Sequence, residues 1–293
     1  GWFFTLHAIS TLLFDSVAYK NVVSNGLVLD KSGNKMSKRL GNAVDPFETI
    51  KKHGADPTRW YMISNAQPWD NLKFDEEGIV EVKRKFFGTL YNAYSFYALY
   101  ANIDDFEYKN NSCPVSKRDK TDKWIISEMN SLIKAVEEHY EDYEPTKAAR
   151  AIQDFVINKL SNWYIRLNRR RFWKGEFNQD KKNAYSTLFE CLEKISLISS
   201  PIAPFYMDRL YQDLNQCNKS VHLAKFPAFN NEFINVSLEA EMRLAQKLSS
   251  AILSLRKKEK IRVRQPLECA LIATSNNAVK DGVKKAKDLV LAE

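Results

Sequence analysis

The amino-acid sequence predicts a mainly α-helical fold, in which a mixed α/β segment leads into a helical bundle. Three observations predict this fold class. Apolar residues recur at helical spacing through four long stretches after about residue 76. Before that point, short apolar runs alternate with glycine-bounded turns, which is typical of strands and short helices. A chain of 293 residues, 44% of them hydrophobic, can also bury a large core without disulfides or metals.

Residues 1–75 are expected to be mixed α/β. A helix is predicted at the start, and two short apolar runs, 22–23 and 27–29, suit strands or strand-like turns. A polar loop follows. Two helices are then predicted to begin at Asp45-Pro46 and Asp56-Pro57, because an aspartate cap followed by proline is a helix-start signal, and Gly54 closes the first of them. The apolar residues of the initial helix are Phe3, Leu6, Ile9, Leu12 and Leu13.

Residues 76–235 are predicted to form the bundle. Each of its four long helices keeps one face apolar, and Pro201 and Pro204 end the fourth. A loop is expected from Cys217 to Asn235. The four apolar faces comprise Ile79, Val82, Phe86, Leu90 and Tyr97; Ile125, Met129, Leu132 and Val136; Ile152, Phe155, Val156, Leu160, Trp163 and Leu167; and Tyr185, Leu188, Leu192, Ile195 and Ile198.

Residues 236–293 are predicted to hold a basic helix and the start of a small α/β region. The helix runs from about Leu238 to Lys258, a strand is expected from Glu268 to Thr274, and a last helix from Lys280 to Leu291. The chain begins without Met and stops just after a helix, so we expect a piece of a longer protein. The apolar face of the basic helix comprises Leu244, Leu248, Ile252 and Leu255.

Positive charge is concentrated in two stretches of the sequence. The formal net charge is +8 at pH 7. Arg166 to Lys182 holds seven Lys or Arg against two Asp or Glu, and Arg256 to Arg264 holds six against one. A field focused in this way attracts polyanions, above all nucleic acid. Two solvated helix faces would give the same pattern and are the alternative.

Several classes of protein are excluded by composition. The mean hydropathy is −0.43, and no apolar run approaches the ~20 residues that a membrane span needs, so no membrane partner is expected. The four cysteines lie far apart without a Cys-x-x-Cys pair, which predicts no metal site and no disulfide framework in this chain. That pattern suits a reducing, cytoplasmic location. The four histidines are isolated and are expected to be structural or on the surface.

Chemistry is predicted for the stretch from Gly33 to Asn42. It places Lys35, Lys38 and Arg39 beside a serine hydroxyl between two glycines. Fixed cations of this kind stabilise the charge that develops in phosphate chemistry, and the glycines allow the loop to open and close. No Walker-type pattern is present. A basic surface loop is the alternative that composition alone leaves open.

The pentapeptide Lys35-Met36-Ser37-Lys38-Arg39 resembles the KMSKS signature of class I aminoacyl-tRNA synthetases, with Arg39 in place of the last serine. Four flanking stretches occur in the order of the isoleucine, valine and leucine subgroup: Asn25-Gly26-Leu27-Val28, Gly41-Asn42, Asp45-Pro46 and Gly54-Ala55-Asp56. The resemblance implies that residues 1–75 end a Rossmann-like α/β catalytic domain and include its stem-contact region. It implies ATP with Mg²⁺ as cofactor. It also implies that Lys35 and Lys38 are catalytic and bind the ATP phosphates together with Met36 and Ser37, stabilising the departing pyrophosphate.

Later motifs are similar to those of isoleucyl-tRNA synthetases. They imply an anticodon-binding bundle, tRNA(Ile) and isoleucine as partners, and a monomeric ligase. A valyl-tRNA synthetase or another class I relative is the alternative, because the valyl enzymes share the loop and the bundle. The motifs are Pro68-Trp69-Asp70-Asn71-Leu72-Lys73-Phe74, Arg84-Lys85-Phe86, Asn162-Trp163-Tyr164-Ile165-Arg166, Arg170-Arg171-Phe172-Trp173, Ser199-Ser200-Pro201-Ile202-Ala203-Pro204-Phe205, Leu255-Arg256-Lys257-Lys258 and Val263-Arg264-Gln265-Pro266-Leu267.

The RNA contacts are predicted on arginines and lysines rather than on tryptophans. Arg166 and Arg170 lie one helical turn apart and can share an exposed face, with Arg171 as a further candidate. Trp163 and Leu167 fall on the apolar face and are expected in the core. The second cluster supplies the remaining candidates, Lys257, Lys258, Arg262 and Arg264.

One family element does not occur in this sequence. The second ATP signature of these enzymes, His-x-Gly-His, is missing, and the amino acid pocket and editing domain of the family would lie upstream. The chain alone is therefore expected to be inactive. Any zinc of the longer enzyme would lie outside this chain. A non-enzymatic RNA-binding helical protein is the alternative from a different class.

Overall fold

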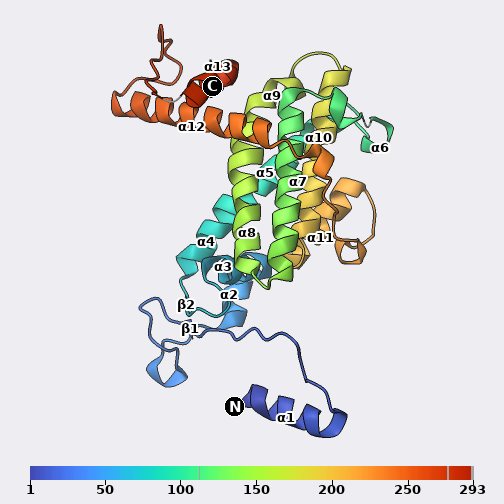
Figure 1. The fold of residues 1–293 in the computed structure, drawn as a ribbon, viewed down its shortest axis with the longest axis vertical. Coiled ribbons are helices and arrows are strands. Elements are labelled where there is room, and N and C mark those ends of the chain that lie inside the picture. Colours follow the sequence, from blue (N-terminus) through green and yellow to red (C-terminus); the bar gives the residue numbers. More distant parts are fainter. Residues whose placement is uncertain (112, 276, 292–293) are drawn as a thin grey trace.

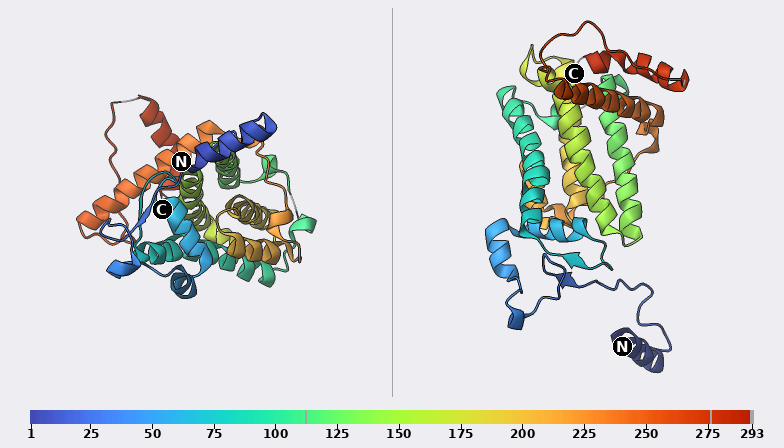
Figure 2. Two further views of the ribbon diagram at one scale, coloured as in Figure 1. Left: turned by 90° about the horizontal axis from the view of Figure 1, so that it is seen from below. Right: turned by 90° about the vertical axis from the view of Figure 1, so that its left-hand side faces the viewer.

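The computed structural model describes residues 1–111, 113–275 and 277–291, which form three parts along one axis (Figure 1). The N-terminal part lies at one end and the helical bundle in the middle. Helices α12 and α13 cross the opposite end of the bundle, as the side view in Figure 2 shows. In the part of the chain that is described, no helix is both long and apolar enough to cross a bilayer.

The N-terminal part holds three helices and a short parallel strand pair. Helix α1 (Trp2–Phe14) stands apart from the bundle and buries none of its residues (Figure 1). Strand β1 (Val28–Leu29) pairs in parallel with β2 (Leu72–Lys73), and α2 (Pro46–His53) and α3 (Ala55–Asn65) lie between them in sequence. The predicted first helix is confirmed. The strand or strand-like turn predicted over residues 22–23 is wrong, since these residues form neither, whereas Val28 and Leu29 of the second run form β1.

The approach to β1 requires a glycine. The amide of Gly26 donates to the carbonyl of Pro68 at 2.8 Å, and the amide of Leu27 donates to Asn71 Oδ1 at 2.8 Å. A Cβ atom on Gly26 would lie only 2.0 Å from the carbonyl oxygen of Asp70. The two segments can therefore meet only because residue 26 has no side chain.

The two predicted helix starts in this part have different outcomes. Asp45 caps α2 as expected, since its Oδ1 accepts from the amides of Phe47 and Glu48, and Gly54 ends α2 with a φ of 93°. The prediction that Asp56 caps its own helix is wrong, because α3 already begins at Ala55. Asp56 is buried and accepts instead from the amide of Tyr206, in the first turn of α11. It caps a helix that is 150 residues away in sequence.

The bundle is built from four long helical rods. The first runs without a break through α4 (Glu76–Val82), the π-helical turn η2 (Lys83–Phe87) and α5 (Gly88–Ile103). The second is α7 (Lys120–Glu141). The third joins α8 (Pro145–Asp154), the π-helical segment η4 (Phe155–Ile165) and α9 (Arg166–Trp173), and the fourth is α10 (Gln179–Ser199). All four predicted apolar faces lie in the core, with only Leu167 half-buried, so these predictions are confirmed.

One helix of the bundle was not predicted. Helix α11 (Pro204–Asn215) packs against α10, which already ends at Ser199. Pro204 occupies the first turn of α11, where a missing amide hydrogen costs nothing, so it starts a helix instead of ending one. Residues 217–235 are the predicted loop, with two single 3₁₀ turns, η5 (Val221–Leu223) and η6 (Asn231–Phe233). Short turns η3 (Val115–Lys117) and α6 (Tyr108–Asn111) complete the connections.

The C-terminal part is helical, without the predicted strand. Helix α12 (Val236–Lys258) packs on α7, and α13 (Asn277–Leu291) packs on α12, which confirms both helices. The strand expected from Glu268 to Thr274 is wrong. The described residues of this segment are irregular, no other segment pairs with them, and Leu271 is 94% exposed. A strand needs a partner ladder, and apolar content alone cannot supply one.

Candidate functional site

Residues 33–42, called here the signature loop, are held in shape by two polar side chains. Asn42 receives the amide hydrogen of Ser37 on its Oδ1 at 2.8 Å and donates from Nδ2 to Asp30 Oδ2 at 2.9 Å. Asp30 Oδ1 also accepts from the amide of Asn34 at 2.7 Å. The Asn42 and Asn34 hydrogen bonds keep the pKa of the Asp30 carboxyl below its ordinary value. The carboxylate is therefore ionised and fixes both ends of the loop at neutral pH.

The signature loop carries three cationic side chains on the surface. Lys35, Lys38 and Arg39 are exposed, and none of them forms an ion pair within the described part of the chain. Met36 is half-buried against the core and anchors the middle of the loop. The loop thus presents two ammonium groups and a guanidinium on a fixed backbone. This arrangement suits a polyphosphate, which brings its own negative charge.

The signature loop is also joined to the first rod of the bundle. Lys31 pairs with Asp75 at 3.1 Å and with Glu77 at 3.4 Å. Asp75 caps α4 by accepting from the amide of Glu77. These exposed pairs contribute little to stability, but they link the base of the loop to the helix that starts the bundle.

A second candidate surface, called here the α9 basic face, comprises Arg166, Arg169 and Arg170. All three residues are exposed on α9, at the end of the bundle that α12 crosses (Figure 1). Trp163, one turn earlier, is 5% exposed and belongs to the core, as expected. Exposed arginines one turn apart on a single helix can track a phosphate backbone.

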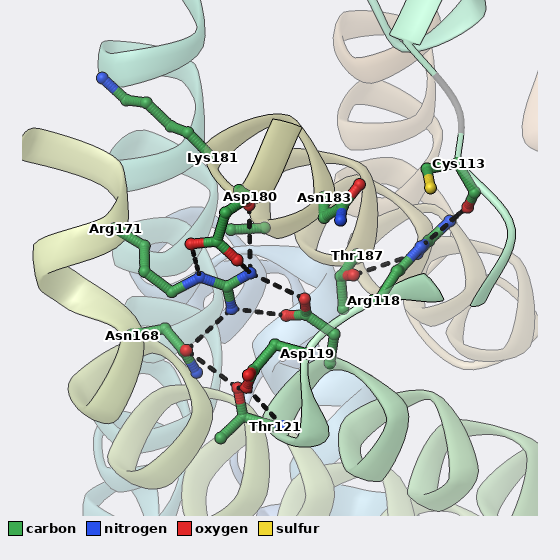
Figure 3. Close-up of polar contacts among 12 residues, drawn as sticks. Cys113, Arg118, Asp119, Thr121, Asn168, Arg171, Asp180, Lys181, Asn183 and Thr187 are labelled. Carbon is green, nitrogen blue, oxygen red and sulfur yellow. Dashed lines mark hydrogen bonds and ion pairs between the residues drawn. The ribbon is translucent and has the colours of Figure 1, made fainter. Parts of the chain in front are cut away.

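Arg171 points into the protein, unlike the α9 basic face. Its guanidinium lies between two acidic groups. It donates to both oxygens of Asp122, at 2.8 and 2.9 Å, and to both oxygens of Asp180, at 2.7 and 2.9 Å. Figure 3 shows the contact between Arg171 and Asp180. It also donates to Asn168 Oδ1 at 2.9 Å. Burial acts to lower the pKa of Arg171, but the hydrogen bonds and charge of fully buried Asp122 outweigh burial and raise it.

The Arg171 contacts join three helices near their ends. Asp122 lies on α7 and Asp180 on α10, so one side chain ties both helices to α9. Asp122 also accepts from the hydroxyl of Tyr164 at 2.6 Å. The geometry favours a structural role for Arg171, which fixes the helix that carries the α9 basic face.

Four residues of the second basic stretch, called here the C-terminal basic cluster, lie at the end of α12 and in the loop beyond it. Its members are exposed, and none forms an ion pair within the described residues. Arg256 has a different role, since its Nη1 donates to the carbonyls of Arg262 and Gln265 and holds the loop in its turn. The cluster comprises Lys257, Lys258, Arg262 and Arg264.

Histidine and metal chemistry add no further site. His53 is buried and contacts Glu76 at 3.2 Å, while His222 is exposed and contacts the carbonyl of Pro204. In residues 1–111, 113–275 and 277–291, no group of three or more His, Cys, Asp and Glu side chains is placed to hold a metal ion.

Two roles in this site were not predicted. Asp30 and Asn42 shape the signature loop, and Arg171 positions α9. An Asp followed by Gly-Asn within four residues is a turn signal, which offered a hint of the first role. No local pattern reveals the second, because the partner Asp122 lies 49 residues away in sequence.

The whole chain shares its sequence pattern with tRNA ligases. Residues 122–271 match the anticodon-binding domain of tRNA ligase, and residues 1–75 match the class I tRNA synthetases (I, L, M and V). The first match covers just over half of the chain, and the chain therefore belongs to the family of tRNA ligases with this anticodon-binding domain.

The particular relatives are isoleucine–tRNA ligases. That of Bacteroides fragilis is 59% identical over 100% of this chain and 26% of its own length. The enzyme of Cytophaga hutchinsonii is 59% identical over 100% of this chain and 27% of its own length, and that of Clostridium tetani is 44% identical over 93% and 27%. The chain thus spans about a quarter of the length of the curated relatives that it matches.

A solved structure supports the fold. The LeuRS of Agrobacterium radiobacter K84, crystallised in a ternary complex with tRNA and LeuAMS, superposes with a TM-score of 0.62 at 19% identity. The match covers 79% of this chain and 27% of that chain. The helical architecture is therefore one that a tRNA synthetase uses.

Proposed function

We propose that this chain works as part of an isoleucine–tRNA ligase, which activates isoleucine with ATP and transfers it to tRNA(Ile). The observation that carries the proposal is the signature loop, which presents Lys35 and Lys38 without acidic partners among the described residues, within a chain 59% identical to isoleucine–tRNA ligases over its whole length. Those relatives favour isoleucine over valine, and an enzyme over a non-enzymatic RNA-binding protein.

In the proposed reaction, Lys35 and Lys38 bind the phosphates of ATP. ATP arrives with Mg²⁺, which neutralises part of the triphosphate charge. The carboxylate of isoleucine forms a bond to the α-phosphorus while the bond from that phosphorus to the β-phosphate breaks. Charge then accumulates on the leaving pyrophosphate, and the two ammonium groups stabilise it. The backbone of Met36 and Ser37 holds the lysines at a fixed spacing, and Asn42 holds Ser37.

The division of labour follows the three parts of the chain. We propose that residues 1–75 complete the catalytic domain and that residues 76–235 bind the anticodon arm of tRNA(Ile). Residues 236–293 would extend the basic surface. Arg166, Arg170 and the C-terminal basic cluster bind RNA phosphates in this proposal, while Arg171 holds the helix in place. The ligase acts as a monomer in the cytoplasm.

The proposal is tested by replacing Lys38 in the longer ligase. Lys38→Ala should slow adenylate formation by roughly 10²–10³, since it removes one charge-stabilising donor, and should leave tRNA affinity nearly unchanged. ATP–pyrophosphate exchange and tRNA filter binding measure the two effects. Lys51→Ala, an exposed lysine on α2, is the matched control and should change neither. If Lys38→Ala mainly weakened RNA binding, the enzymatic role of the loop would be wrong.

The chain by itself should show no ATP–pyrophosphate exchange with isoleucine, because the His-x-Gly-His element does not occur in it. Exchange above background by the purified 293-residue chain would contradict this division of labour.

A further inference from the structure

A polar groove lies between the third rod of the bundle and α12. It has a volume of about 480 Å³ and lies between Asn158, Asn162 and Arg166 on one side and Gln246, Ser250 and Leu253 on the other. None of the described residues that line it is acidic. Arg166 belongs to the α9 basic face, and Leu253 lies one turn before Lys257 of the C-terminal basic cluster. The groove therefore joins the two basic surfaces.

Several polar groups of this groove lack hydrogen bonds to the described residues of the protein. The Asn162 amide makes no hydrogen bond to any of the described residues, and Gln246 uses only Nε2, in a long bond of 3.4 Å to the carbonyl of Asn158. Trp163 and Ser249 also line the groove, and within the described part of the chain their buried Nε1 and Oγ atoms have no hydrogen-bond partner. Buried polar groups are normally satisfied, so the junction of η4 and α12 has an unfilled set of donors and acceptors.

The chemistry of the groove fits a base better than a phosphate. A phosphate site gathers several cations, whereas this groove has one arginine among amides and hydroxyls. Side-chain amides carry a donor and an acceptor on adjacent atoms, which match the edges of nucleobases. Unpaired RNA bases can be splayed outward and read on these edges, while an arginine at the rim binds the adjoining phosphate.

We propose that this groove binds one unpaired nucleobase of the anticodon loop and reads it through the amides of Asn162 and Gln246. The proposal rests on the proposed function, because it takes tRNA(Ile) as the partner. It goes further by assigning base recognition to two residues that are neither basic nor aromatic.

The test uses the chain and an anticodon stem-loop of tRNA(Ile) in which each loop nucleotide is made abasic in turn. Asn162→Ala and Gln246→Ala should each weaken binding of the intact stem-loop by about threefold to tenfold, the effect of removing one hydrogen bond. At the nucleotide that the groove reads, the abasic stem-loop should bind these variants and the unaltered chain equally. Asn102→Ala, an exposed asparagine on α5, is the matched control and should change nothing.

Two outcomes separate failure of this inference from failure of the proposed function. Arg170→Ala should weaken every stem-loop by the same factor, whichever nucleotide is abasic. If Arg170→Ala does so but the two amide variants bind all stem-loops as the unaltered chain does, the base-reading groove is wrong and RNA binding stands. If no stem-loop binds above a scrambled RNA, both proposals are overturned. Thermal unfolding checks that each variant is folded.

Discussion

At the scale of single residues, neighbouring arginines in one run perform different tasks. Arg170 is exposed, whereas the Arg171 side chain is only 15% exposed and binds Asp122 and Asp180. The difference comes from helix geometry, since adjacent positions are about 100° apart and only one of them faces α7 and α10. A run of basic residues therefore cannot be treated as one binding surface.

Arg171→Ala should destabilise the fold by about 3 kcal/mol, because it leaves the fully buried Asp122 carboxylate without its cation. Arg170→Ala is the matched control and should change the free energy of unfolding by less than about 0.5 kcal/mol. Urea denaturation measures both. Equal stability of the two variants would show that the Asp122 charge is compensated without Arg171.

Asp56 should cause the free energy of unfolding to fall as pH rises, a direction that is unusual for a carboxyl group that caps a helix. Burial raises the pKa of its carboxyl above the ordinary 3.8, more than the amides of Tyr206 and Phe205 lower it. A carboxyl whose pKa is raised by folding stabilises the fold fully below its unfolded pKa, and this contribution is lost as pH rises through the folded pKa.

Asp56→Asn removes that ionisation but keeps an oxygen for the amide of Tyr206. The free energy of unfolding of this variant, relative to the unaltered chain, should therefore increase as pH rises above 3.8 and then level off. Urea denaturation between about pH 4 and 7 measures the difference. Parallel pH profiles would contradict a raised pKa for Asp56.

At the scale of elements, the strand pair requires a glycine at residue 26, whereas the first rod can accept a side chain at residue 88. Gly26→Ala should destabilise the chain by about 1–3 kcal/mol, since its Cβ would lie 2.0 Å from the carbonyl oxygen of Asp70. Gly88→Ala is the control: the site is helical, and its Cβ would make an ordinary contact at 3.4 Å. It should be neutral or stabilising by up to about 1 kcal/mol. Thermal unfolding compares them, and equal effects would contradict the close approach at Gly26.

The sequence predicted correctly those elements that are determined by residues close together in the sequence. The apolar faces of the four rods recur every three to four residues, and the core buries them as expected. The strand at residues 268–274 failed because a strand depends on a partner that no local pattern shows. Helix α11 was not predicted because a proline such as Pro204 can start a helix as well as end one. Only the capping of α11 by Asp56, which is distant in sequence, shows that Pro204 starts a helix.

The candidate site also has a part that the sequence predicts and a part that depends on the fold. The cations of the signature loop are adjacent in sequence, so their common exposure follows from one short segment. The groove beside Asn162 was not predictable, because it forms between η4 and α12, some 90 residues apart, and needs the docking of the two helices. Sites made by one loop can be recognised from sequence, while sites made between elements require the fold.

At the scale of the whole molecule, the net charge of +8 acts through the exposed basic surfaces at the end of the bundle. RNA binding by the chain should weaken steeply with salt, because each neutralised phosphate releases counterions. The double variant Lys257→Ala/Arg264→Ala should reduce the slope of log K against log salt by about 0.7–0.9 for each phosphate that the variant no longer neutralises.

The control for this experiment is a lysine already neutralised by the protein. Lys120 pairs with Glu241 at 2.5 Å, so Lys120→Ala should lower affinity slightly without a comparable change of slope. Filter binding of tRNA(Ile) over a series of salt concentrations measures both variants. A slope unchanged by the double variant would mean that Lys257 and Arg264 do not neutralise RNA phosphates, which would contradict their place in the proposed RNA surface.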